Sequence, residues 1–373
     1  MTLPRIVEDF LALVTTPSHS FKERRVADLL LAWLKEMGLE VREDKAGEAA
    51  GGEAGNLIAR WPGDPSIEAI LFSAHMDRVS NPGKITPVLD EAQGLIKSDG
   101  TTILGADDAS GLAAIIDGIR RVAGEGAPHG DVELALTIAE EVGLKGSRGL
   151  DYSLLRSKMG FVLDSSGPVG TLVNQAPTQR TAKIDIFGKS AHAGMCPEEG
   201  INAIRLGALA LASLKEGRLS PVSTSNFGII KGGQATNIVC DHLHIEGEAR
   251  SHDEGELIAY CHEVDKAFER LAELGGRVEI KWTEEYQAFN VGPEEKVTKI
   301  ALKAISAIGR EPAIVRGGGG MDANHFNQHG IKSLGLSVGY ENVHTQREAQ
   351  SISELVLAGE AVAAIIKAAA QGG

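Results

Sequence analysis

Cysteine is scarce in this sequence, which has three cysteines in 373 residues: Cys196, Cys240 and Cys261. No two of them have the CxxC spacing typical of zinc fingers, and a sparse, odd set does not build the disulfide framework of a small secreted domain. The scarcity therefore excludes both classes and indicates a reducing compartment. We expect a cytoplasmic protein.

Basic residues and long apolar runs are also few. Lysine and arginine number 37 against 51 aspartates and glutamates, which gives a formal net charge of −14. A nucleic-acid partner would require a basic excess, so we expect none. No run approaches the roughly 18 apolar residues of a membrane span. The segment MTLPRIVEDF at the N-terminus is too charged for a signal peptide, and we expect no membrane partner.

Helical and strand-like periodicities alternate in the first and last parts of the chain. They predict helices at about 4–14, 21–37, 109–122, 293–308 and 352–369, and strands at 56–61, 69–74, 132–138, 160–163, 313–315 and 332–337. A hairpin around Asp99-Gly100 is predicted over 94–103. This alternation is typical of an α/β fold.

The middle of the chain has a different pattern. Strands are predicted at 181–187, 226–230, 242–249 and 277–283, with helices at 200–214 and 254–271. The order β-α-β-β-α-β is that of an open-faced α+β sandwich. We therefore predict two domains, one formed by 1–177 and 289–373, and an inserted one formed by 178–288.

Three of the predicted apolar strands run directly into residues that can bind metals. The strands are followed by His75 and Asp77, by Glu140 and Glu141, and by Asp164. Ligands of α/β sheets collect at the carboxyl ends of the strands, where the chain leaves the core. We expect these side chains to converge.

Two of these clusters have ordinary alternatives when taken singly. His75 and Asp77 leave the strand on the same side, either as a metal ligand with its supporting carboxylate or as a surface histidine beside a turn. Asp107 and Asp108 precede a predicted helix, where one aspartate is enough for an N-cap and a second would be free to reach cations.

The remaining candidates are equally open when taken singly. Glu140 and Glu141 point to opposite faces because they are adjacent in an extended chain, so one can bind a metal while the other holds a water. An exposed acidic turn is the alternative. Asp164 and His344, which lies in a polar loop, are weak signals by themselves.

The joint pattern favours a metal centre. Imidazole and carboxylate groups without thiolates suit zinc, manganese or cobalt. Five ligands, one of them a carboxylate able to bridge, suit two metals about 3.5–4 Å apart, which lower the pKa of a shared water toward ~7. A further carboxylate beside them can act as general base.

Several segments together resemble the dizinc exopeptidase family that contains peptidase T, aminoacylase and the glutamate carboxypeptidases. They are HMDRV at 75–79, GADDASGLAAI at 105–115, EEVGLKGS at 140–147, LDSSG at 163–167, GKSAHAGMCPEEGINAI at 188–204 and GGGGMDANHFNQHGI at 317–331. Asp164, where several relatives have glutamate, and the GGGGMDAN segment make the chain resemble peptidase T and peptidase T-like proteins most closely. The resemblance implies a catalytic domain with a central mixed sheet and an inserted lid that forms a homodimer through 178–288.

The resemblance also implies a ligand set for two divalent ions, zinc in the first place, with cobalt or manganese as alternatives. His75 and Asp164 would bind one ion, Glu141 and His344 the other, and Asp107 would bridge them. A non-proline cis peptide is expected after the bridging residue.

Two residues beside the metals would serve the reaction. Glu140 would be the general base for a metal-bridging hydroxide, and Asp77 would orient the imidazole of His75.

In the same way, the resemblance implies roles outside the metal centre. His192 would reach the active site of a partner subunit and stabilise the tetrahedral oxyanion; the alternative is an ordinary loop histidine. Asn237 and Arg250 match substrate-contacting positions, although Arg250 could instead form a surface salt bridge. Backbone N–H groups of Gly318 and Gly319 would face a substrate carboxylate or oxyanion, unless the tetraglycine is only a flexible turn.

The expected activity is hydrolysis of short peptides by a metal-dependent exopeptidase, in the first place a tripeptide aminopeptidase. An N-acyl amino acid deacylase or a carboxypeptidase-type amidohydrolase would use the same metals, so fold and ligands do not separate them. A third reading is a catalytically inactive binding protein on the same fold.

Overall fold

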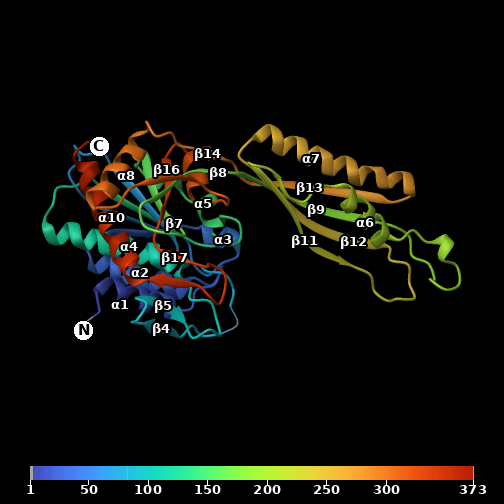
Figure 1. The fold of residues 1–373 in the computed structure, drawn as a ribbon, viewed down its shortest axis with the longest axis horizontal. Helices are drawn as coiled ribbons and strands as arrows, with labels where there is room; N and C mark the ends of the chain where they lie inside the picture. The colour runs from blue at the N-terminus through green and yellow to red at the C-terminus, as the bar shows by residue number, and fades with distance from the viewer. Residues whose placement is uncertain (1–2, 82, 373) are drawn as a thin grey trace. The chain divides into compact units, whose positions relative to one another are not determined.

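The computed structural model describes residues 3–81 and 83–372. The chain divides into two compact units, one formed by Met1–Ala176 with Phe289–Gly373 and the other by Pro177–Ala288. Figure 1 shows the helices and strands of both units, and each unit has a hydrophobic core of its own. The fold is α/β with a mixed central sheet in the first unit, as the sequence and its resemblance predicted.

The central sheet of the first unit has the strand order β1-β2-β6-β3-β7-β16-β8-β14, with β15 paired to β8. Its strands are β1 (Glu40–Glu43), β2 (Leu57–Trp61), β3 (Ile70–His75), β6 (Val132–Thr137), β7 (Met159–Ser165), β8 (Thr171–Ala176), β14 (Phe289–Asn290), β15 (Ala313–Arg316) and β16 (Lys332–Ser337). The four neighbours β6, β3, β7 and β16 run parallel. Their carboxyl ends therefore meet at one edge of the sheet.

Helices cover this sheet, and every residue of its strands β3 and β6 is buried. They are α1 (Arg5–Thr15), α2 (Arg24–Glu36), α3 (Ala46–Ala50), α4 (Ala106–Glu125), α5 (Lys145–Arg148), α8 (Lys296–Ala307), α9 (Ala323–Gln328) and α10 (Ile352–Ala370). Helix α4 packs so closely on α10 that a Cβ added at Gly118 would lie 2.4 Å from Cγ1 of Val362. The burial on both sides explains why β3 and β6 read as continuous apolar runs.

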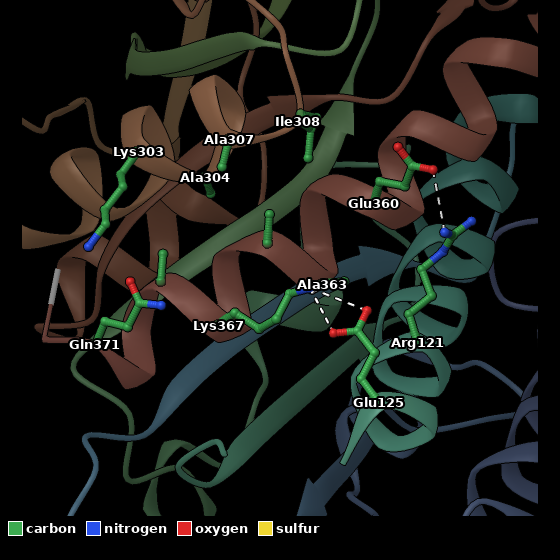
Figure 2. A pocket seen from close by; sticks show the side chains of 12 residues that line it. Arg121, Glu125, Lys303, Ala304, Ala307, Ile308, Glu360, Ala363, Lys367 and Gln371 are labelled. Carbon is green, nitrogen blue, oxygen red and sulfur yellow. Dashed lines mark hydrogen bonds and ion pairs between the residues drawn. The ribbon is translucent and has the colours of Figure 1, made fainter. Parts of the chain in front are cut away.

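The outer surface of α10 forms the floor of a groove of about 470 Å³ between α4 and α8 (Figure 2). Alanines of α8 and α10 line it, and Lys303 of α8 stands at its rim. Two ion pairs join α10 to α4: Lys367 Nζ lies 2.9 Å from Glu125, and Arg121 Nη1 lies 3.4 Å from Glu360. These pairs fix the C-terminal helix on the longest helix of the unit.

A small sheet with the order β17-β18-β5-β4 lies apart from the central one. It contains β4 (Pro87–Asp90), β5 (Leu95–Ser98), β17 (Tyr340–Glu341) and β18 (Ala349–Ser351). The predicted hairpin around Asp99-Gly100 is wrong: β5 pairs backward with β4 across a turn that ends at Gly94, whose φ is 67°. The Asp99 turn leads instead into the loop before α4, and β18 comes from the end of the chain to pair with β5.

The second unit is a five-stranded antiparallel sheet with helices on one face. Its order is β10-β11-β12-β9-β13, and its elements are β9 (Thr178–Phe187), α6 (Ala203–Ser213), β10 (Gly217–Ser220), β11 (Ser223–Gly232), β12 (His242–Ser251), α7 (Glu254–Glu269) and β13 (Arg277–Tyr286). Alternate residues of β9 and β12, such as Ile184 and Ile245, pack under the helices. Strand β10 was not predicted, because its four residues carry little apolar pattern.

Short 3₁₀ helices complete the described chain, at Tyr152–Leu154, Pro197–Glu199 and Arg270–Leu274. The cysteines Cys196, Cys240 and Cys261 are free. In the parts that the structure describes, none of the helices combines the length and the apolar character needed to traverse a bilayer.

Candidate metal centre

The polar residues that follow the parallel strands converge with two loops at the sheet edge. His75 ends β3, Asp164 lies near the end of β7, and Asp107 lies at the start of α4. In each of three groups, one ligand atom from every residue lies within 4.8 Å of the others: His75–Asp107–Glu141, His75–Glu140–Asp164 and Asp107–Asp108–Asp164. The structure thus brings the strand-end residues together as the topology predicts.

Asp107 lies between two imidazoles. Its Oδ1 is 3.0 Å from Nε2 of His75, and its Oδ2 is 3.4 Å from Nε2 of His344. His75 Nε2 also lies 3.7 Å from Asp164, and His344 Nε2 lies 3.0 Å from Glu141. Each oxygen of the Asp107 carboxylate thus faces a different histidine, which is the arrangement that a bridging ligand requires.

Asp77 is buried and connects two of the strand ends. Its main-chain oxygen accepts a hydrogen bond of 2.9 Å from Nδ1 of His75, which leaves Nε2 to face the cluster. Its carboxylate accepts the backbone N–H groups of Glu140 at 2.9 Å and Glu141 at 3.3 Å, and the hydroxyl of Ser20 at 2.7 Å. Asp77 therefore orients the imidazole and the paired glutamates together.

Asp107 and Asp108 have different roles, one toward the cluster and the other as a helix cap. Asp107 faces the cluster, whereas Asp108 accepts the backbone N–H of Gly111 at 3.0 Å and that of His75 at 3.2 Å. Regular helical geometry begins only after Asp108, so this residue acts as the cap. The peptide bond between the two aspartates is cis, as the resemblance implied.

Burial and mutual charge shift the protonation of the cluster in the polypeptide alone. Burial acts to lower the pKa of His75, but hydrogen bonds to Asp107 and Asp164 outweigh it and raise that pKa well above its usual value. Hydrogen bonds to Asp107 and Glu141 raise the pKa of His344 to about 10. Burial raises the pKa of Asp164 to about 7.

Glu140 and Asp107 are shifted in opposite directions. Burial, and then the charge of Asp164, raise the pKa of Glu140 well above its usual value. Burial also acts to raise the pKa of Asp107, but hydrogen bonds to His344 and His75 outweigh it and lower that pKa. Buried carboxylates that outnumber their imidazoles need further positive charge, and the donor set of nitrogen and oxygen fits divalent zinc, cobalt or manganese.

Tyr340 belongs to the cluster and was not predicted. Its buried hydroxyl donates to Asp164 at 3.1 Å and lies 3.4 Å from Asp107. The residue begins the short strand β17, four positions before His344, and no sequence motif marks it. Left-handed backbone at His344 (φ 62°) and at Ala139 (φ 47°), next to Glu140, is also invisible in the sequence; such conformations gather at functional sites.

The other predicted side chains belong to the second unit. His192 is exposed after β9, and its Nδ1 accepts the backbone N–H groups of Gly194 and Met195, each at 3.2 Å. The neutral ring therefore carries its proton on Nε2. Ala193 N–H donates to the main-chain oxygen of Asn237 at 2.9 Å, so the His192 and Asn237 loops lie side by side.

Arg250 and the glycine loop are placed as follows. Arg250 on β12 forms two hydrogen bonds to Glu248, at 2.9 Å and 3.0 Å, which is the surface ion pair considered as its alternative. Gly318 and Gly319 lie in the loop between β15 and α9 of the first unit, and the space around Gly318 is open. Their substrate contacts remain predictions.

Two family models match the chain. The model of peptidase family M28 matches residues 56–192, and that of the M20 peptidase dimerisation domain matches residues 178–275. The first covers most of the strand ends that converge, and the second covers most of the smaller unit.

Full-length relatives are similar to the chain as well. The uncharacterized protein YqjE of Bacillus subtilis is 41% identical over 98% of this chain and 99% of its own length. Among solved structures, aminopeptidase PepT from Bacillus cereus is 39% identical with a TM-score of 0.88, and a tripeptidase from Staphylococcus aureus is 36% identical with a TM-score of 0.93. Both alignments cover 98% of each chain.

Proposed function

The chain belongs to the M20 family of metallopeptidases, close to peptidase T, and from this premise we propose that it is an aminopeptidase that removes the N-terminal residue of tripeptides. The observation that carries the proposal is the convergence of two histidines, His75 and His344, with four carboxylates, those of Asp107, Glu140, Glu141 and Asp164. The finer specificity is supported by the names of the two similar structures, an aminopeptidase and a tripeptidase.

The residues present fit a pair of divalent cations, most simply zinc. His75 with Asp164 would hold one, and Glu141 with His344 the other, with Asp107 between them. This assignment is supported by the two oxygens of Asp107, each of which faces a different imidazole. Bound divalent cations polarise a scissile carbonyl and lower the pKa of water toward ~7.

Glu140 is proposed as the general base. Its carboxylate lies within the same donor group as His75 and Asp164, while its backbone is held by Asp77. It would take a proton from the attacking water and give it to the leaving amine. Burial that raises its pKa favours a group able to hold that proton between the two steps.

The second unit is proposed to dimerise and to supply the oxyanion donor. The dimerisation-domain match supports a homodimer through residues 178–288. Exposed apolar side chains offer material for an interface: Ile229 and Ile230 on β11 are 41% and 58% exposed, and Leu209 on α6 is 49% exposed. Because Nδ1 of His192 accepts two backbone N–H groups, its Nε2–H is available to an oxyanion in the partner's site.

Compartment and substrate contacts complete the proposal. Three free cysteines without a disulfide among them are consistent with action in the cytoplasm. Arg250, Asn237 and the backbone of Gly318 and Gly319 are proposed to contact the peptide.

A specificity profile tests the proposed activity. The purified protein, loaded with zinc, is assayed on dipeptides, tripeptides and tetrapeptides of one composition and on the matching N-acetyl amino acid. We expect the highest kcat/KM on tripeptides, with release of the N-terminal residue. A higher kcat/KM on the N-acetyl amino acid would establish a deacylase instead, and no hydrolysis by a metal-loaded chain would favour a binding protein.

A further inference from the structure

Glu348 is a buried carboxylate that holds the loop before α4, outside the predicted ligand set. The residue is 1% exposed. Its Oε2 accepts the backbone N–H groups of Leu104 at 2.9 Å and Gly105 at 2.8 Å, and its Oε1 accepts the backbone N–H of Asp107 at 3.1 Å. Three main-chain donors from one short loop thus converge on one side chain from a distant part of the sequence.

The two segments that Glu348 joins each carry a proposed metal ligand. Asp107 lies on the loop that donates the hydrogen bonds, and His344 lies four residues before Glu348 on the segment that supplies the carboxylate. The backbone N–H of Glu348 is in turn bonded to the main-chain oxygen of Thr345 at 3.1 Å, which ties it to the His344 turn. The contact between Nε2 of His344 and Asp107, at 3.4 Å, spans the same two segments.

The loop that carries these donors turns sharply at Gly105. Gly105 has a left-handed backbone, with a φ of 75°, and a Cβ there would lie 2.9 Å from Nη1 of the buried Arg78. Successive backbone N–H groups around such a turn form a concavity that binds an anion. A carboxylate is suited to it because its two oxygens accept without presenting a donor.

We propose that Glu348 is a positioning residue of the metal centre, which fixes Asp107 relative to His344 through the backbone of residues 104–107. The inference rests on the proposed function, since it takes Asp107 and His344 as ligands. Residues that orient metal ligands from outside typically contribute 10- to 100-fold to metal affinity. A side chain that served only the stability of the fold would leave that affinity unchanged.

The test is a comparison of Glu348→Gln with Glu354→Gln in the full chain. Glu354 is a matched control, because its carboxylate also accepts a backbone N–H, that of Val169 at 2.6 Å, and lies on the same C-terminal segment without contact to a proposed ligand. Zinc affinity is measured by competition with a chelator, and the Co²⁺-loaded proteins are compared by their visible absorption. Thermal unfolding of the metal-free proteins separates stability from binding.

We expect Glu348→Gln to weaken zinc binding by about 10- to 100-fold and to change the Co²⁺ spectrum, because its amide group presents a donor to a backbone N–H. Glu354→Gln should keep the affinity and spectrum of the unaltered chain, whatever its thermal stability. Unaltered affinity and spectrum in Glu348→Gln would overturn the inference.

A second variant covers the case in which Glu348→Gln does not fold. Glu348→Asp retains the charge but is one methylene shorter, so it should reach only part of the loop and weaken zinc binding by a smaller factor. Zinc affinity equal to that of the unaltered chain in this variant would also overturn the inference. If the unaltered chain itself binds neither Zn²⁺ nor Co²⁺, the proposed function fails, which is a different outcome.

Discussion

The two units differ in how firmly they hold their candidate functional residues. In the first unit, His75 and Asp77 have almost fully buried side chains, and each is fixed by more than one hydrogen bond. In the second unit, His192 and Asn237 lie exposed in neighbouring loops, and the two hydrogen bonds to the His192 ring come from backbone N–H groups of its own exposed loop. The residues proposed to bind metal are thus placed by the fold, whereas the groups that the second unit is proposed to supply to a substrate or a partner lie on its surface.

The largest effect is expected when two adjacent residues of the cluster, Glu140 and Glu141, are substituted one at a time and compared. Glu140→Gln should lower kcat by about 10²- to 10⁴-fold, the usual contribution of a general base. Its metal content, measured by mass spectrometry of the purified protein, should stay at the level of the unaltered chain. Glu141→Gln is the matched variant and should lose metal, because Glu141 contacts His344.

The contrast between these neighbours decides their roles. Normal turnover in Glu140→Gln would remove it from the mechanism. Loss of metal from Glu140→Gln, with retention in Glu141→Gln, would exchange their assignments.

The next largest effect is expected in the exposed part of the comparison. His192→Ala should lower kcat by about 10²- to 10³-fold, the usual effect of removing one oxyanion donor, without changing metal content. His262→Ala is the control, since His262 is an exposed histidine on α7 of the same unit. Equal kcat in the two variants would show that His192 is an ordinary loop histidine without a role in the reaction.

Subunit mixing then tests whether His192 acts across a dimer. Chains carrying Glu140→Ala are mixed with chains carrying His192→Ala under conditions of proven exchange. A site composed of an intact Glu140 and the partner's intact His192 should restore part of the activity. No restoration would indicate that His192 acts in its own chain.

A smaller effect is expected at Arg250, where the structure has an ion pair with Glu248. A charge-assisted hydrogen bond to a substrate carboxylate is worth about 1.5–3 kcal/mol, so Arg250→Ala should raise KM for a tripeptide by about 10- to 100-fold. The tripeptide amide, which lacks the carboxylate, should be affected much less. An equal change in KM for both substrates would mean that Arg250 does not bind the substrate carboxylate.

The comparison also explains what the sequence can predict here. His75 and Asp164 were found because each follows an apolar strand, and parallel strands present their ends at one edge. Tyr340 and Glu348 escaped because their roles depend on the pairing of β17 with β18 and of β18 with β5, which lies more than 240 residues earlier. The hairpin was misplaced for the same reason. The local Asp-Gly signal predicted a turn at residues 99–100, but β5 pairs with β4 on one side and with β18 on the other.

The last prediction concerns the pH dependence of metal binding, which probes how firmly the cluster holds its protons. Hydrogen bonds to Asp107 and Glu141 raise the pKa of His344 to about 10 in the polypeptide alone, so its imidazole carries two protons from pH 6 to 8. A metal binds only the deprotonated ring, and its binding must release that proton. This proton alone should make the affinity fall about tenfold for each unit by which the pH is lowered, and the proton on His75, whose pKa is also raised, should make the fall steeper.

Below about pH 7 the decline should steepen, because burial raises the pKa of Asp164 to about 7 and its carboxyl then also binds a proton that metal displaces. Calorimetric titration of the metal-free protein with Zn²⁺, in buffers of different ionisation enthalpy, counts the protons released at each pH. His344→Ala should remove about one proton from that count, and His262→Ala none. Zinc affinity that does not change between pH 6 and 8 would mean that the cluster is not protonated before metal enters. The ligands of the first unit would then be deprotonated as well as correctly positioned before metal binds.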